Sequence, residues 1–413
     1  MVKSGAMQTP LRFVSLFAIA LAACAEAPKP MEAANCSADM AAFTDISAMR
    51  DHVRNRMAYP TGGGVDVDAI HAGLEARARQ ARTKTEQLRV MEAFVYQLGD
   101  HHAHLGRNDD DSPRLVPTGA SVWIEPRGAD LVVAEARPGS PARAGGLREG
   151  MVIDSIEGAP LSSLKPPPAT VERADAMRAF AARVALAGTH NHDTNIIAHD
   201  ANGSVAVTIS EVLSGPDEPA TLTWPAPGVA MIRLNNSIGS SALPPAFDKL
   251  MKEAGKASTI LLDLRDTPSG GDTSVAKPLM SWFVKGSQGY QTHQRGAKTW
   301  TEQVTGRRDY FQGRLIILID HWTGSMGEGT AIGLRSAAHA VLVGTSMAGL
   351  RGAIEGQDLP CSKVNFRLPV ERLYEVGGGP RELAKPDVLV TESELAEAGT
   401  RDAVLERALR MAR

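Results

Sequence analysis

The sequence lacks the features that mark several classes of protein. Its 413 residues include only three cysteines, and 44 basic side chains are nearly balanced by 47 acidic ones, giving a formal net charge of -3. No basic run or stripe of aromatic and basic residues indicates a nucleic-acid surface. The apolar run at residues 13–24 is shorter than the roughly 20 residues that span a bilayer. With 43% hydrophobic and 22% charged residues, the composition predicts a globular protein of two or three domains that does not bind nucleic acid.

The N-terminus has the pattern of a targeting segment. Lys3 and Arg12 precede the apolar run, which predicts a secretory signal peptide over residues 1–24. Its last residues, LAAC, resemble a bacterial lipobox, in which Cys24 is lipidated and becomes the first mature residue. Ordinary cleavage of the signal is the alternative. Residues 25–36 then form a flexible linker. We expect an exported bacterial protein, periplasmic or an outer-membrane lipoprotein, that meets the membrane only through this anchor.

The other two cysteines are Cys36 and Cys361. An even pair in an oxidising compartment favours a disulfide between the start of the N-terminal domain and the distant C-terminal one. Two separate thiols are the alternative that the sequence leaves open.

Residues 37–110 read as a helical N-terminal domain. The segment 66–98 carries apolar residues at three- and four-residue spacing, with no proline and only Gly73 inside it. Gly99 and Asp100 end the pattern, and residues 106–114, GRNDDDSPR, read as an acidic loop.

Short strands are predicted over residues 116–165, around the stretch RPGSPARAGGLREG at 137–150. There Ser140 and Pro141 supply a helix cap and first residue, and two glycines end the helix. This stretch resembles a PDZ domain, the alternative being another small β-rich module. The resemblance implies that an extended peptide binds as an added strand, with its C-terminal carboxylate at the backbone of Gly119, Ala120 and Ser121.

Residues 166–218 are predicted to connect this domain to the next one, through a proline-rich piece, a helix and a returning strand. Residues 219–398 alternate apolar strands with helices, which predicts a layered α/β sheet. A C-terminal helix is expected at 399–413. The predicted fold class is therefore α+β and multidomain, with a helical N-terminal domain, a PDZ-like β-rich domain and a layered α/β domain.

Four stretches of the last domain resemble one family, the C-terminal processing, or tail-specific, serine peptidases and their tricorn-like relatives. They are LLDLRDTPSGGD at 261–272, TGSMGE at 323–328, VLVGTSMAGLRG at 341–352 and KPDVLV at 385–390. The family pattern has a small residue where Met326 stands. The resemblance implies a crotonase- or ClpP-like catalytic fold, a serine nucleophile at Ser325 and no metal or cofactor.

Ser325 also has a simpler explanation, because Ser325-x-x-Glu328 is a capping box that needs no catalysis. The two roles are compatible, since a helix N-terminus offers free N–H groups to an oxyanion. The Met326 N–H is one candidate donor. By resemblance to the family, Gly270 or Gly271 supplies the second, because glycine lets the backbone approach a substrate closely.

The general base departs from the bacterial pattern. Leu350 stands where many relatives have a lysine, and the neighbouring Arg351 does not lose its proton at physiological pH. Tricorn-like members use a histidine from the N-terminal domain. In LGDHHAHLGRND, alignment on Asp100 makes His102 the base, with His101 or His104 as alternatives in register.

The rest of the tricorn-like tetrad is incomplete. His101 stands where those relatives have a serine, and Glu382 is the nearest candidate for the glutamate that orients the base. Glu375 is an alternative. The orientation of His102 is therefore not settled by the resemblance.

Taken together, the sequence predicts a serine endopeptidase that hydrolyses extended or unfolded polypeptides through an acyl-enzyme on Ser325. Two alternatives stay open. One is a catalytically degenerate protein that binds peptides through its PDZ-like domain. The other is a metal-dependent hydrolase that uses His101, His102 and His104 with Asp100, to which the HxH pair at 190–192 adds a second set of ligands.

Overall fold

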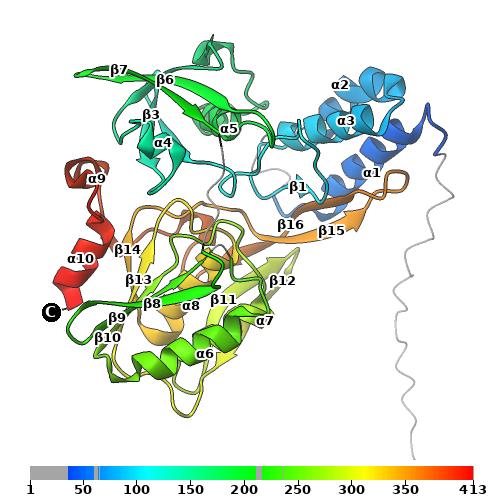
Figure 1. Ribbon diagram of the computed structural model, residues 1–413. Coiled ribbons are helices and arrows are strands. Elements are labelled where there is room, and N and C mark those ends of the chain that lie inside the picture. Colours follow the sequence, from blue (N-terminus) through cyan, green and yellow to red (C-terminus); the bar gives the residue numbers. More distant parts are fainter. Residues whose placement is uncertain (1–35, 60–63, 65, 211–215, 236, 413) are drawn as a thin grey trace, which may run out of the picture. The chain divides into compact units, whose positions relative to one another are not determined.

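The computed structural model of the protein describes residues 36–59, 64, 66–210, 216–235 and 237–412 (Figure 1). The predicted signal peptide with Cys24, and the linker up to residue 35, lie outside these ranges. The described part is a mixed α+β structure with a helical N-terminal region and three β-sheets. None of its helices is long and apolar enough to cross a membrane.

The N-terminal region consists of α1 (Ala41–Arg56), α2 (Val67–Gln80) and α3 (Lys84–Gln97). The segment predicted as helical at 66–98 thus forms two helices. The break has a local cause, because Thr83 and Glu86 form a capping box, with the Thr83 N–H 2.9 Å from the Glu86 carboxylate. Met49 and Phe94 of this region pack in one core with Phe366 of a C-terminal strand.

The β-rich region is an antiparallel sheet of the order β2-β3-β4-β6-β7, with β5 paired to β4. Helix α4 begins as predicted, with the Ser140 hydroxyl accepting the Arg143 N–H at 3.2 Å. The predicted boundary at residue 165 is wrong. The segment predicted to be a connection supplies two strands of the sheet and the helix that packs on β2. Their buried apolar residues belong to the same core as those of the earlier strands. The elements are β2 (Val122–Arg127), β3 (Asp130–Ala136), α4 (Pro141–Ala144), β4 (Val152–Ile156), β5 (Ala159–Pro160), two 3-10 turns (Leu161–Ser163 and Val171–Arg173), α5 (Ala174–Ala187), β6 (Thr194–Asp200) and β7 (Gly203–Ile209).

The C-terminal region contains a sheet of the order β17-β14-β13-β10-β9-β8, parallel except for the edge strand β8. Its central strands are continuous apolar runs because both faces are covered. Ile317 and Ile319 of β13 share a core with α6, α7 and α8, whereas Ile316 and Leu318 share another with α9 and α10. The elements are β8 (Ala220–Ala226), β9 (Val229–Leu234), α6 (Leu243–Glu253), a 3-10 turn (Ala254–Lys256), β10 (Thr259–Asp263), α7 (Thr273–Met280), β13 (Arg314–Ile319), α8 (Met326–Ala338), β14 (Val341–Gly344), a 3-10 turn η4 (Arg381–Leu383), β17 (Val388–Leu389), α9 (Glu392–Ala398) and α10 (Ala403–Ala412).

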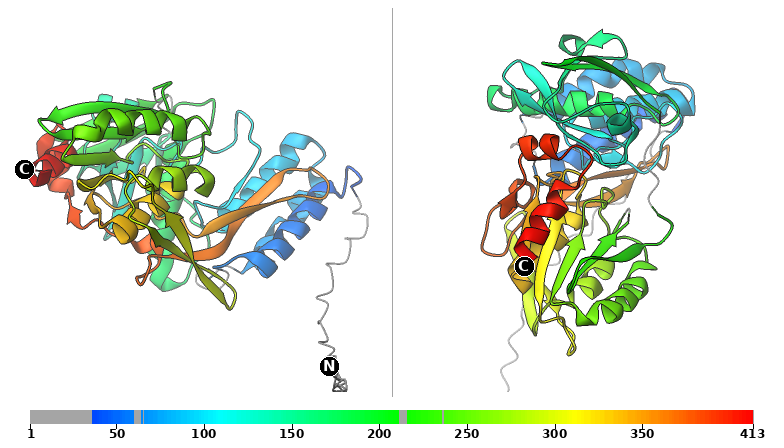
Figure 2. Two further views of the ribbon diagram at one scale, coloured as in Figure 1. Left: turned by 90° about the horizontal axis from the view of Figure 1, so that it is seen from below. Right: turned by 60° about the vertical axis from the view of Figure 1, so that its left-hand side comes forward.

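A third sheet links the C-terminal region to the N-terminal helices. It contains β1 (His104–Leu105), β11 (Ser287–Arg295), β12 (Lys298–Thr305), β15 (Ala353–Asp358) and β16 (Asn365–Tyr374). The long strand β16 pairs with β11 at one end and with β1 at the other, where His104 is opposite Arg367. Figure 2 shows β15 and β16 reaching toward α1. The pairing with β1 fixes the histidine-rich loop, which lies immediately before it in the sequence.

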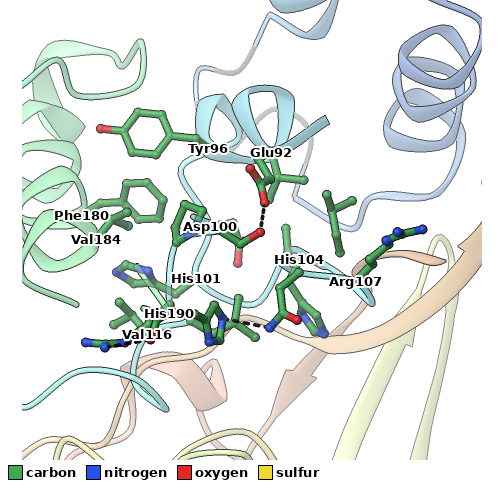
Figure 3. A pocket seen from close by; sticks show the side chains of 18 residues that line it. Glu92, Tyr96, Asp100, His101, His104, Arg107, Val116, Phe180, Val184 and His190 are labelled. Carbon is green, nitrogen blue, oxygen red and sulfur yellow. Dashed lines mark hydrogen bonds between the residues drawn. The ribbon is translucent and has the colours of Figure 1, made fainter. Parts of the chain in front are cut away.

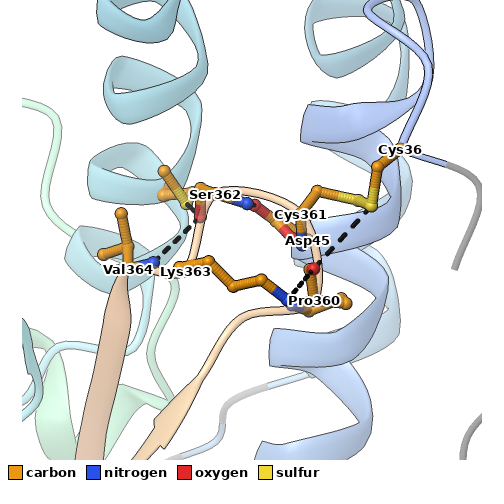
Figure 4. Close-up of a disulfide and its surroundings, with 8 residues drawn as sticks. Cys36, Asp45, Pro360, Cys361, Ser362, Lys363 and Val364 are labelled. Atoms are coloured by element: carbon orange, nitrogen blue, oxygen red, sulfur yellow. Dashed lines mark hydrogen bonds between the residues drawn. A yellow bond between two sulfur atoms is a disulfide. The ribbon is translucent and has the colours of Figure 1, made fainter.

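A disulfide joins Cys36 to Cys361, as the sequence favoured (Figure 4). Next to it, the buried Asp45 carboxylate of α1 accepts the N–H groups of Cys361 and Ser362, at 2.8 and 2.9 Å. The turn between β15 and β16 is therefore held by one covalent bond to Cys36, which precedes α1, and by two hydrogen bonds to Asp45 of α1.

We expect the double variant Cys36→Ser, Cys361→Ser to fold with lower stability. A cross-link that closes so long a loop restricts the unfolded chain, and its loss costs about 2–4 kcal/mol. Thermal unfolding under oxidising conditions should show a lower Tm for the variant. Reductant should lower the Tm of the wild type and leave that of the variant unchanged. An equal Tm for both oxidised proteins would contradict a stabilising disulfide.

Candidate active site

The turn between β13 and α8 presents Ser325. Its backbone has φ 49° and ψ -108°, a conformation that costs a non-glycine residue about 1–3 kcal/mol. The surrounding turn enforces this conformation. The Thr323 hydroxyl donates to the Leu264 carbonyl at 3.1 Å, and the Trp322 indole N–H donates to the Ala120 carbonyl at 2.7 Å. Ser325 is thus held half-buried at the start of α8.

Ser325 and Glu328 form the predicted capping box. In it the Ser325 N–H donates to the Glu328 carboxylate at 2.7 Å. The Ser325 hydroxyl lies 3.0 Å from Nε2 of His102, which is 223 residues away in the sequence. Capping therefore leaves the hydroxyl within hydrogen-bond distance of an imidazole.

His102 lies between α3 and β1 and is 5% exposed. The Asp100 carboxylate accepts its backbone N–H at 2.8 Å, and its Nδ1 lies 2.7 Å from the Arg351 carbonyl oxygen. Since a carbonyl only accepts, Nδ1 carries the proton and the lone pair of Nε2 faces the Ser325 hydroxyl. Burial, reinforced by the positive charge of Arg381, lowers the pKa of His102 to about 3. The imidazole is therefore neutral near pH 7, the state that can accept a proton.

The glycine-rich turn after β10 packs directly against Ser325. Gly270 has φ 63°, and a Cβ there would lie 2.4 Å from Cβ of Ser325 and 3.0 Å from its Oγ. The Gly270 N–H is used within its own turn, donating to the Thr267 carbonyl at 3.0 Å. In the described part of the chain, the N–H groups of Gly271 and Met326 have no hydrogen-bond acceptor. Of the two predicted glycine donors, Gly271 is therefore the one whose N–H is available.

The arrangement can carry out acyl transfer. It places a hydroxyl on a strained backbone at a helix N-terminus, with a neutral imidazole beside it and unused N–H groups nearby. The sequence profile of Peptidase family S41 matches residues 228–390, which include Ser325 and the glycine-rich turn. This segment is a peptidase family S41 domain. The protein is accordingly a peptidase of the serine type.

Solved structures with a similar fold extend the likeness beyond the S41 domain. Mature CPAF superposes with a TM-score of 0.61 at 13% identity, covering 91% of this chain and 97% of that one. The photosystem II D1 C-terminal processing protease gives 0.57 at 15% identity, with 89% and 99% covered. A putative peptidase from Parabacteroides merdae gives 0.54 at 12% identity, with 90% and 96% covered. No curated protein matches the sequence. At these identities the likeness shows a shared fold.

Glu382 does not form the hydrogen bond to His102 that was predicted from the sequence. The position that it would take beside Nδ1 of His102 belongs to the Arg351 carbonyl. Oε2 of Glu382 is buried without a hydrogen-bond partner in the described structure. Glu375, the alternative, pairs instead with Arg335 of α8. No sequence signal marks a backbone carbonyl as a partner, because every residue has one.

The predicted carboxylate-binding loop is also corrected. The Gly119 N–H donates to the Leu115 carbonyl at 2.5 Å and the Ala120 N–H to the Pro117 carbonyl at 3.0 Å, so both donors are used inside the loop. The buried Ala120 and Ser121 leave little access to it. On the adjoining strand β2, the Ile124 carbonyl accepts Nε of Arg183 from α5 at 2.9 Å. The structure does not support a peptide carboxylate at Gly119, Ala120 and Ser121.

The other histidines of the two HxH stretches have partners other than Ser325. His101 stacks on Phe180 at 4.4 Å, with both residues lining the pocket drawn in Figure 3. His104 Nδ1 lies 3.0 Å from the His102 carbonyl, and His190 lies 2.8 Å from the Asn108 amide. No group of three or more His, Cys, Asp or Glu side chains suited to a metal occurs in the ranges that the structure describes.

We expect Gly270→Ala to lower the rate at which Ser325 reacts with a fluorophosphonate probe by about 10²-fold or more, because the added Cβ would displace Ser325. Gly286→Ala is the matched control. Gly286 has φ 68°, and no atom lies within 4 Å of the position that a Cβ would take there, so it shares the backbone strain without the clash. Equal labelling rates for the two variants would contradict the close contact.

The low pKa of His102 predicts that its imidazole stays neutral between pH 5 and 8. An unfolded histidine titrates near 6.5, so the unfolded chain binds the extra proton first as the pH falls. His102 therefore contributes stability that is present above about pH 6.5 and is lost as the pH falls toward 3. Nitrogen-15 NMR of labelled histidine should show an unchanged His102 signal in this range. Titration near 6.5 would show that the imidazole is not buried in solution.

Proposed function

We propose that the protein is an exported serine endopeptidase of the C-terminal processing type, which hydrolyses extended or unfolded polypeptides. The observation that carries the proposal is the 3.0 Å contact between the Ser325 hydroxyl and Nε2 of a buried, neutral His102. Ser325 lies in the S41 domain at residues 228–390, and S41 is a family of peptidases.

In the first half of the reaction, Oγ of Ser325 attacks the peptide carbonyl carbon while Nε2 of His102 takes the hydroxyl proton. The N–H groups of Met326 and Gly271 stabilise the oxyanion. The C–N bond then breaks, and the imidazolium gives its proton to the leaving amine. Ser325 is left as an acyl ester.

In the second half, His102 takes a proton from water as the water oxygen attacks the ester carbonyl. The C–O bond to Ser325 breaks, and the proton returns to Oγ. The products are a free carboxylic acid and the regenerated hydroxyl. No cofactor or metal is required, because each proton that is removed is returned by the same imidazole.

Histidine rather than lysine is assigned as the base. Leu350 stands at the position of the lysine in many relatives, and it is 5% exposed. The neighbouring Arg351 carries only N–H donors on its guanidinium and offers no acceptor for a proton. His102 is therefore the assigned proton acceptor.

Export and the form of the substrate rest on independent support. The Cys36–Cys361 disulfide fits an oxidising compartment, as does the signal-like N-terminus with Cys24 as the proposed lipidation site. One structural neighbour is named as a C-terminal processing protease of photosystem II D1. The β-rich region at 122–209, with its Ser140-Pro141 helix start, is proposed to be PDZ-like and to contribute to substrate selection at a site other than the loop at 119–121.

The proposal is tested by incubating mature protein with an unstructured peptide that has a free C-terminus and analysing the products by mass spectrometry. Ser325→Ala should reduce cleavage to background, and His102→Ala should reduce it by about 10²–10⁴-fold. Both variants should keep the wild-type Tm within a few degrees. Cleavage that persists in Ser325→Ala would refute the assigned nucleophile. No cleavage by the wild type, with peptide binding retained, would show a non-catalytic peptide-binding protein.

A further inference from the structure

The turn at residues 349–352 determines which way the Arg351 carbonyl points. The carbonyls on either side of it, those of Leu350 and Gly352, both accept from Nη2 of Arg381, at 2.9 and 3.0 Å. The Arg351 carbonyl between them points to His102 instead. One guanidinium thus holds the two flanking peptide groups and leaves the middle one facing the imidazole.

The same turn is held from its N-terminal side by Glu328. Oε1 of Glu328 accepts the N–H groups of Gly349 at 2.9 Å and Leu350 at 3.2 Å. Its other oxygen, Oε2, accepts the Ser325 N–H. One carboxylate therefore contacts both the backbone of the nucleophile and the turn that contacts the base.

Both charged side chains are built into the interior. Glu328 is 0% exposed and Arg381 is 3% exposed, and the closest approach between their charged groups is 3.8 Å, from Nη2 to Oε2. At that separation neither satisfies the other by a short hydrogen bond. Glu328 accepts backbone N–H groups of the turn and of Ser325, and Nη2 of Arg381 donates to two carbonyls of the turn, whereas Nε of Arg381 is buried without a partner in the described structure. The backbone contacts therefore offset part of the cost of burying these two ionisable groups.

We propose that Glu328 and Arg381 are positioning residues that orient His102 through the backbone, by aiming the Arg351 carbonyl at Nδ1. They take the place of the orienting carboxylate expected at Glu382. With Nδ1 held protonated by the carbonyl, Nε2 presents a lone pair to Ser325. The consequence for the reaction rests on the function proposed above, whereas the orientation of the imidazole is a property of the folded chain.

The test uses Arg381→Lys and Glu328→Gln. A lysine cannot reproduce the planar guanidinium that holds both carbonyls. A glutamine cannot accept N–H groups at both ends of its side chain. Arg335→Lys is the matched control, since Arg335 also donates to a backbone carbonyl, that of Lys385 at 2.8 Å, but does not contact the turn at 349–352.

The first readout is independent of activity. Nitrogen-15 NMR of labelled histidine distinguishes the two neutral tautomers of His102. We expect the Nδ1–H form in the wild type and in Arg335→Lys, and a mixture of the two forms in Arg381→Lys and Glu328→Gln. An unchanged tautomer in both test variants, with a folded protein, would overturn the proposal. So would a shift in Glu382→Gln that is absent in Arg381→Lys, because Glu382 would then be the orienting group.

The second readout is peptide cleavage. Misorientation of the base should lower kcat by about 10²-fold in Arg381→Lys while KM stays within about twofold, because substrate binding is untouched. A kcat within twofold of the wild type would overturn the proposal. If the wild type itself does not cleave peptides, the proposed function fails, and the tautomer measurement still decides whether Glu328 and Arg381 orient the imidazole.

Discussion

The hydrogen bond between Ser325 and His102 depends on two segments that meet only in the folded chain, and much of the structure serves to bring them together. The nucleophile belongs to the parallel sheet of the C-terminal region, whereas the imidazole follows the last N-terminal helix. Strand β16 spans the two by pairing with β11 and with β1, two residues after His102. The Cys36–Cys361 disulfide and the Asp45 contacts hold the far end of this strand's hairpin to α1 and to the residue Cys36 that precedes it. Strand pairing and the disulfide hold both segments in place, which keeps the Ser325 hydroxyl 3.0 Å from Nε2 of His102.

The site concentrates features that each destabilise the fold. Ser325 is held at a positive φ, and Glu328 is buried deeply enough to raise its pKa to about 7. His102 is buried in its neutral form, which favours unfolding in acid. These costs are offset by the sheet on which the site is built, where the side chains of β10 and the inner part of β13 are fully buried. Strain of this kind persists where the surrounding structure over-determines the geometry.

The β-rich region is also part of the support of the nucleophile. The Trp322 indole donates to Ala120, and His321 lies 2.7 Å from the Glu135 carboxylate of β3. Both residues precede Ser325 within the same turn. In the loop predicted to receive a peptide carboxylate, the Ala120 carbonyl is used in this internal contact, and the N–H groups of Gly119 and Ala120 donate to carbonyls of the loop itself.

The sequence alone determined the features that depend on near neighbours along the chain. The caps at Ser140 and Ser325, the glycine turn at 270–271 and the buried apolar strands follow from short-range sterics and hydrogen bonds. The capping box at Thr83 carried the same kind of signal and marks the break that the helical pattern of 66–98 concealed. His102 was predicted in another way, from the resemblance of the stretch around Asp100 to a family motif. Tertiary structure decided which backbone N–H and C=O groups remain available to bind a side chain or a substrate. No local sequence pattern marks the Arg351 carbonyl as the partner of His102, or the N–H groups of Gly119 and Ala120 as used inside their loop. The same holds for the membership of β6 and β7 in one sheet. Every residue carries the same peptide group, and only the packing of distant segments determines where that group points.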